Sequence, residues 1–148
     1  MSASEFRSGF VCLVGRPNAG KSTLTNRIIG RKIAITSDRP QTTRRTVRGV
    51  LTRPDAQLIV VDTPGLHKPR TLLGERLNDL VRATWTEVDV IGFCLAANEE
   101  TGPGDRKLAA ELASIQRGPI IAVVTKTDAA SPDDVAARLA SISELAAE

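Results

Sequence analysis

The stretch GRPNAGKS at residues 15–22 is the strongest indication of the fold class, because it fits the phosphate-loop pattern G-x-x-x-x-G-K-[ST]. The apolar run FVCLV precedes it, and TLTNRIIG, which has helical periodicity, follows it. Glycines in such a loop let successive backbone N–H groups turn inward around a phosphate, at the positive end of a helix. The alternative is a glycine-rich turn with a solvated lysine, and the setting between strand and helix favours the phosphate loop.

Outside this loop, apolar runs of strand length alternate with segments of helical periodicity. The expected strands are 9–14, 46–52, 57–62, 88–96 and 119–125, and the expected helices are 22–30, 76–85, 105–115 and 133–145. The central strands are apolar nearly throughout, as strands covered by helices on both faces are. We therefore predict an α/β fold with a mostly parallel sheet between helical layers.

The composition indicates one globular domain. The chain has 148 residues, 41% hydrophobic and 25% charged, and it has no run of eighteen apolar residues that could span a bilayer. The first residues, MSASEFRSGF, lack the apolar region of a secretory signal, so we expect a cytoplasmic protein. Cys12 and Cys94 lie within apolar runs and are expected to be reduced core thiols.

Basic residues are concentrated between residues 27 and 53, although the net charge is only +3. Against the single acid Asp38, this stretch contains Arg27, Arg31, Lys32, Arg39, Arg44, Arg45, Arg48 and Arg53. It could contact RNA or form a solvated surface, and charge alone leaves both alternatives open.

The residue types in the phosphate loop indicate a nucleoside triphosphate as the ligand. Lys21 is placed to reach the β- and γ-phosphates, and the Ser22 hydroxyl is placed to ligate Mg²⁺. The residues expected to contact the nucleotide here are Gly15, Arg16, Pro17, Asn18, Ala19, Gly20, Lys21, Ser22 and Thr23. The loop alone does not specify the base.

A second polar segment follows the apolar strand QLIVV and comprises Asp62, Thr63, Pro64 and Gly65. A carboxylate at a strand end lies beside the phosphate site in this class of fold. Asp62 can hold Mg²⁺ through water there, while the Gly65 N–H faces the γ-phosphate.

A third segment follows the strand PIIAVV and comprises Thr125, Lys126, Thr127 and Asp128. The Asp128 carboxylate can accept hydrogen bonds from both the N1–H and the exocyclic amine of guanine, whereas adenine offers no such pair of donors. The Lys126 stem can cover the base. This segment therefore indicates a guanine nucleotide.

In this order and spacing, GRPNAGKS, DTPG and TKTD resemble the first, third and fourth guanine-nucleotide motifs of translation-factor-related small GTPases. ITSDRPQTTRR (35–45), DTPGLHKPR (62–70) and NDLVRATWTEVDVIGFCL (78–95) are similar to the Era-type GTPases, and the resemblance covers essentially the entire chain. It implies a Ras-like P-loop GTPase domain, GTP hydrolysis with Mg²⁺, and a role in 16S rRNA maturation and small-subunit assembly.

The resemblance also implies roles for residues in the loops. Thr43 would close over Mg²⁺ and the γ-phosphate, with Thr42 as the competing choice and a solvated loop as the alternative to both. Asn18 matches the position that helps bind K⁺ in potassium-activated members, and a turn residue bonded to its own loop is the alternative. The implied catalytic set is Lys21, Thr43, Gly65 and Asn18, and the implied metal ligands are Ser22, Thr43 and Asp62.

The sequence departs from the family pattern at two motifs. Thr125 replaces the usual Asn, so we expect weaker guanine affinity, with specificity kept by Asp128. Leu66 follows DTPG, where signalling GTPases orient water with Gln, and leucine cannot do so by hydrogen bonding. Hydrolysis is therefore expected to be slow and K⁺-stimulated. His67 could act as a general base, but a dissociative transition state asks little of one, which favours a non-catalytic histidine.

The sequence stops at Glu148, where another strand and helix would be expected. We therefore expect residues 1–148 to form a GTPase domain truncated before its final strand and helix, without the later loop that meets the guanine O6 and without the KH domain. PIIAVV would then be an apolar sheet edge. The KH domain would make the main 16S rRNA contact. Peripheral association with the inner membrane face is also compatible with the resemblance, and no obligate oligomer is expected.

Two other functions compete with a GTPase switch. One is a non-hydrolysing, guanine-nucleotide-gated module that binds RNA or the ribosome, which Leu66 favours. The other is a P-loop ATPase or kinase, which predicts no discrimination between adenine and guanine at Asp128.

Overall fold

Strands and helices alternate along the part of the chain that the computed structural model describes, residues 5–30, 46–62, 72–115 and 118–147. The strands are β1 (Arg7–Val14), β2 (Thr46–Thr52), β3 (Ala56–Asp62), β4 (Val90–Ala96) and β5 (Ile120–Thr125). The helices are α1 (Lys21–Ile29), α2 (Leu72–Glu87), α3 (Pro103–Ile115), the 3₁₀ helix η1 (Thr127–Ala129) and α4 (Pro132–Ala147). Every element predicted from the sequence is present with slightly shifted ends, and η1 is an addition.

The five strands form one sheet in the order β2-β3-β1-β4-β5. The neighbours β3–β1, β1–β4 and β4–β5 are parallel, which confirms the predicted α/β fold with its mostly parallel sheet. The pair β2–β3 is antiparallel. Only residues 53–55 connect the two strands, and such a short connection can form a hairpin but not the longer crossover that a parallel pair requires.

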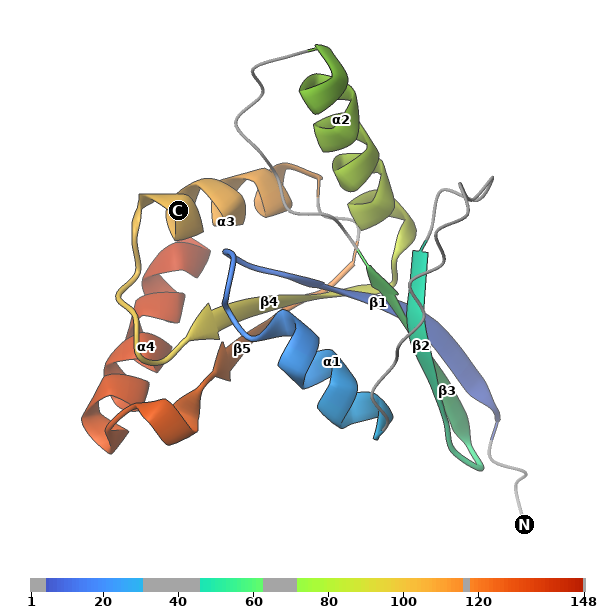
Figure 1. The fold of residues 1–148 in the computed structure, drawn as a ribbon, viewed down its shortest axis with the longest axis horizontal. Coiled ribbons are helices and arrows are strands. Elements are labelled where there is room, and N and C mark those ends of the chain that lie inside the picture. Colours follow the sequence, from blue (N-terminus) through green and yellow to red (C-terminus); the bar gives the residue numbers. More distant parts are fainter. Residues whose placement is uncertain (1–4, 31–45, 63–71, 116–117, 148) are drawn as a thin grey trace.

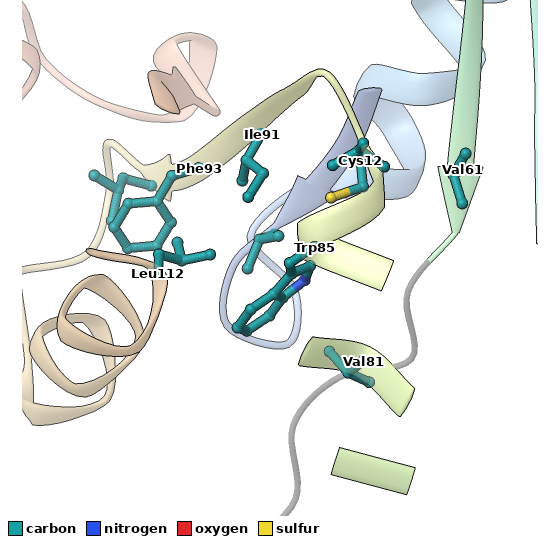
Figure 2. Close-up of a cluster of buried hydrophobic side chains, with 10 residues drawn as sticks. Cys12, Val61, Val81, Trp85, Ile91, Phe93 and Leu112 are labelled. Carbon is teal, nitrogen blue, oxygen red and sulfur yellow. The ribbon is translucent and has the colours of Figure 1, made fainter. Parts of the chain in front are cut away.

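The larger part of the core lies on one face of the sheet. Figure 1 shows α1 on one side of the sheet, with α2 and α3 on the other. Apolar side chains of α2, α3 and the adjacent strands pack together in this core. Figure 2 labels Cys12, Val61, Val81, Trp85, Ile91, Phe93 and Leu112. Burying a large side chain of this kind stabilises the fold by roughly 1.5–3 kcal/mol. This packing fixes the strand ends from which the loops of the site emerge.

β5 lies at the edge of the sheet, paired only with β4 among the described strands. Ile121 in this strand is 55% exposed. The structure thus confirms the prediction that the segment PIIAVV forms an apolar sheet edge. Within the described residues, no helix has the length and apolar character that a bilayer crossing requires.

The cysteines Cys12 and Cys94 are both buried and both free. Burial raises the pKa of the Cys12 thiol to about 12. It raises the pKa of Cys94 to about 11, and the nearby Lys21 ammonium opposes this shift to a smaller extent. Core thiols were predicted from the sequence, and the structure confirms them.

We expect neither thiol to react with Ellman's reagent in the folded chain at pH 8, whereas both should react after unfolding in guanidinium. The thiolate is the reactive form, and the raised pKa values disfavour it in the fold. The same shifts make a contribution to stability that is fully present below about pH 9, the ordinary thiol value, and is lost as the pH rises towards 11–12. Rapid labelling of the folded chain at pH 8 would contradict the burial of both thiols.

Candidate nucleotide-binding site

The predicted phosphate loop occupies the connection between β1, which ends at Val14, and α1, which begins at Lys21. Gly20 caps the helix with φ of 85°, in the left-handed region that glycine adopts readily. Asn18 is also left-handed, with φ of 64°, and asparagine is among the few other residues that tolerate this. The loop thus has the strand–turn–helix geometry that the sequence predicted, with the helix N-terminus facing the site.

Gly15 lies against the end of β4. A Cβ atom at this position would lie 2.7 Å from the backbone oxygen of Cys94, a distance at which the backbone would have to shift. Within the loop, the Ala19 N–H donates to the Arg16 oxygen at 3.1 Å. The absence of a side chain at Gly15 therefore lets the loop begin in contact with the neighbouring strand.

The Lys21 ammonium lies next to the loop backbone. Its Nζ donates to the Gly15 oxygen at 2.6 Å and to the Arg16 oxygen at 3.3 Å. The Thr25 hydroxyl donates to the Lys21 oxygen at 2.9 Å and supports the first turn of α1. This arrangement places a positive charge where the helix N-terminus also favours an anion.

The segment of residues 125–128, predicted to contact guanine, begins in direct contact with the phosphate loop. The Thr125 hydroxyl donates to the Ala19 oxygen at 2.5 Å, although 106 residues separate the two in sequence. A Cβ at Gly20 would lie 3.4 Å from the Thr125 Cβ, so the two segments are in close contact. The threonine therefore uses its one donor on the phosphate loop. The weaker guanine affinity expected of Thr125 stays a prediction.

Beyond Thr125, the chain turns through η1. Lys126 has φ of 56° and is partly buried, and Asp128 lies in η1 with its side chain exposed. The Ala129 N–H donates to the Lys126 oxygen at 3.0 Å and closes this turn. The turn therefore holds the Asp128 carboxylate in solvent, a few residues from the Thr125 contact.

The end of β3 brings the backbone of Asp62 to the same end of the sheet. β3 is parallel to β1 with Val61 opposite Cys12, so Asp62 lies level with the last residues before the loop. Among the other predicted site residues, Thr43 and the competing Thr42, Thr63, Pro64, Gly65, Leu66 and His67 lie outside the described residues. Their roles stay predictions.

The donor set fits Mg²⁺, which prefers oxygen ligands and is commonly held by one or two carboxylates together with substrate phosphates. Ser22 and Thr23 lie exposed in the first turn of α1, and Asp62 ends the adjacent strand β3. The described residues include no cluster of three or more His, Cys, Asp or Glu that could hold a metal ion. Ser22 and Asp62 remain the predicted Mg²⁺ ligands among the described residues.

One group of residues beside the loop was not predicted. Asp105, at 1% exposure, lies 3.3 Å from the Arg16 guanidinium. The sequence TGPGD (101–105) looks like an ordinary helix start, with Pro in the first turn and an acid near the positive end of the helix. Because a helix-start acid is usually solvated, nothing in the local pattern indicated burial or a partner in the phosphate loop.

Comparisons with known proteins identify the family to which the chain belongs. The family model described as "50S ribosome-binding GTPase" matches residues 10–126. GTPase Era of Streptomyces coelicolor is 68% identical over 142 residues, which are 96% of this chain and 45% of that protein. The chain therefore spans about half the length of the curated relatives it matches.

Two solved structures share the fold. Era in complex with MgGDPNP and nucleotides 1506–1542 of 16S ribosomal RNA has a TM-score of 0.78 and 34% identity, covering 95% of this chain and 48% of that one. A variant of Aquifex aeolicus Era bound to GDP·AlF4⁻ has a TM-score of 0.75 and 34% identity, covering 93% and 47%. The chain thus belongs to the family of 50S ribosome-binding GTPases, and its predicted resemblance to the Era type is confirmed over nearly its whole length.

Proposed function

We propose that this chain binds GTP with Mg²⁺ and hydrolyses it, as the nucleotide switch of an Era-type protein. The observation that carries the proposal is the 2.5 Å hydrogen bond from Thr125 to Ala19. It joins the phosphate loop to the segment that contains Asp128, so that one rigid unit can read both ends of a guanine nucleotide.

At the phosphate end, the residues supply charge and position. Hydrolysis of a γ-phosphate requires neutralisation of charge on its oxygens and an oriented water, with little covalent chemistry. Lys21 provides the positive charge, and the Gly65 N–H would face the γ-phosphate. Ser22, Asp62 and Thr43 would hold Mg²⁺, which supplies further charge neutralisation when it is bound.

Multiple-turnover release of inorganic phosphate from GTP and from ATP tests the proposal. Release from GTP over many turnovers, with none from ATP, is the expected result. Guanine-nucleotide binding without any release would favour the non-hydrolysing gated module instead. Equal turnover of ATP would favour the P-loop ATPase, since that function needs no guanine-reading carboxylate.

We expect K⁺ to accelerate GTP hydrolysis roughly tenfold over Na⁺, a change worth about 1.4 kcal/mol of transition-state stabilisation. Asn18 is the proposed ligand, and it lies exposed in the loop with φ of 64°. Glycine adopts the same backbone conformation without an amide, so Asn18→Gly separates the two roles of this residue. Loss of K⁺ stimulation in Asn18→Gly would support Asn18 as a K⁺ ligand, whereas equal wild-type rates in Na⁺ and K⁺ would contradict K⁺ stimulation.

The proposed partner is 16S rRNA of the small ribosomal subunit. The proposed location of the protein is the cytoplasm, with peripheral association at the inner membrane face. A similar Era structure contains 16S nucleotides, which supports this choice, although the family description names the 50S particle. The main contact would be made by the KH domain that the resemblance to the Era type implies. The basic stretch of this chain, in which Arg27 and Arg53 are exposed, would make a secondary contact with the rRNA.

Co-sedimentation of the GDPNP-loaded chain with 30S particles, and not with 50S particles, is the expected result.

A further inference from the structure

A buried carboxylate lies beside the phosphate loop, at the N-terminus of α3. The Oδ2 atom of Asp105 accepts hydrogen bonds from Arg16 Nη1 at 3.3 Å, from Arg138 Nη2 at 3.3 Å and from the Gly102 N–H at 3.0 Å. Arg16 belongs to the phosphate loop, Arg138 belongs to α4, and Gly102 precedes α3. One carboxylate oxygen therefore joins the loop to two helices.

Arg138 fixes the buried side of this group. It is only 4% exposed, and its Nη1 donates to the Thr101 hydroxyl. Thr101 donates to the Ser141 hydroxyl at 2.8 Å, and Ser141 donates back to the Arg138 backbone oxygen at 2.7 Å. A buried ionised carboxylate needs a charged partner and hydrogen bonds, and Arg138 with Gly102 supplies both. The position of Asp105 is thus set independently of the phosphate loop.

Arg16 is the more exposed partner. Its side chain is 39% exposed, and its Nη1 also lies 3.8 Å from the Glu99 carboxylate. Its backbone oxygen accepts from the Ala19 N–H at 3.1 Å and from Lys21 Nζ at 3.3 Å. Arg16 therefore connects the buried carboxylate to the turn of the loop and to its lysine.

We propose that Asp105 is a positioning residue for nucleotide binding: anchored by Arg138 and the α3 N-terminus, it holds Arg16 and so fixes the phosphate loop in its binding conformation. The proposal rests on the proposed function, because it concerns the affinity of this loop for a guanine nucleotide. A carboxylate that merely joins α3 to α4 would stabilise the fold without acting through Arg16.

A double-mutant cycle distinguishes these two roles. Asp105→Asn keeps the shape of the side chain and removes its charge, and Arg16→Met removes the guanidinium. GDP affinity and melting temperature are measured for the wild type, both single variants and the double variant. We expect Asp105→Asn to lower GDP affinity roughly tenfold in the wild-type background and less than about twofold in the Arg16→Met background. Its effect on the melting temperature should persist in both.

Glu111→Gln is the matched control, because Glu111 makes a 3.2 Å ion pair from α3 to Arg82 of α2, away from the loop. This variant should leave GDP affinity unchanged. Equal affinity losses from Asp105→Asn in both backgrounds, or no loss at all, would overturn the proposal. Failure of the wild type to bind GDP would instead overturn the proposed function.

Amide hydrogen exchange tests whether Arg16 holds the phosphate loop, and it needs no nucleotide. It can be measured even if Asp105→Asn does not fold. Arg16 lies at the exposed end of the group, so Arg16→Met preserves the buried pair of Asp105 with Arg138. Faster amide exchange over residues 15–22 in Arg16→Met, with unchanged exchange in α3 and α4, supports the proposal. Wild-type exchange over residues 15–22 contradicts it.

Discussion

Replacing Lys21 with methionine is expected to slow GTP hydrolysis by roughly two to three orders of magnitude, the usual effect of removing one preorganised donor from a transition state. The ammonium lies 2.6 Å from the Gly15 oxygen, inside the curve of the loop. Methionine keeps most of the stem and removes the charge. The expected loss therefore reports on charge at the γ-phosphate rather than on the packing of the helix.

The measurement is the single-turnover rate at saturating GTP, with GDP affinity measured alongside. Lys107→Met is the matched control, because Lys107 is exposed on α3 and its replacement makes the same chemical change outside the phosphate loop. The control should retain the wild-type rate. A Lys21→Met variant that hydrolyses GTP as fast as the control would show that the loop lysine has no part in phosphoryl transfer.

Replacing Asp128 with asparagine should lower GDP affinity by about 10²–10⁴-fold, because two hydrogen bonds to a charged acceptor are lost at about 1.5–3 kcal/mol each. Asparagine presents an amide donor where guanine also presents donors. Xanthine has an oxygen at the position of the guanine amine, and this oxygen can accept from the amide. We therefore expect the variant to prefer xanthine nucleotides.

Competition between GDP and xanthosine diphosphate for the wild type and for Asp128→Asn measures this change. Asp133→Asn is a suitable control, because Asp133 is exposed in the first turn of α4 and should leave base preference unaltered. An unchanged preference for GDP in Asp128→Asn would mean that the base is read elsewhere, and it would return the P-loop ATPase to consideration.

The elements of this fold could be predicted because their signals are local. The phosphate loop requires glycine at Gly20, where the backbone is left-handed, and at Gly15, which approaches Cys94. Both glycines lie within the eight residues of the loop pattern. The helix predicted over 133–145 is present as α4, and reciprocal hydrogen bonds of 3.1 and 3.2 Å between Ser131 and Asp134 cap its start.

The contacts that join the site could not be predicted, because they link residues distant in sequence. The Thr125 bond to Ala19 spans 106 residues, and the pair of Arg16 with Asp105 spans 89. Periodicity reports which side chains face a core and is silent on which polar groups meet there. Asp105 has the local signature of a solvated helix-start acid, and only the packing of α3 beside the loop and α4 makes it a buried partner.

Titration of the purified 148-residue chain with fluorescent GDP and ADP analogues, in Mg²⁺ and K⁺, shows whether the site selects guanine nucleotides. Circular dichroism on the same samples establishes that the chain is folded. We expect saturable binding of GDP and no measurable binding of ADP, because Asp128 and the phosphate loop act as one unit. A folded chain that binds neither nucleotide, or that binds both equally, would contradict it.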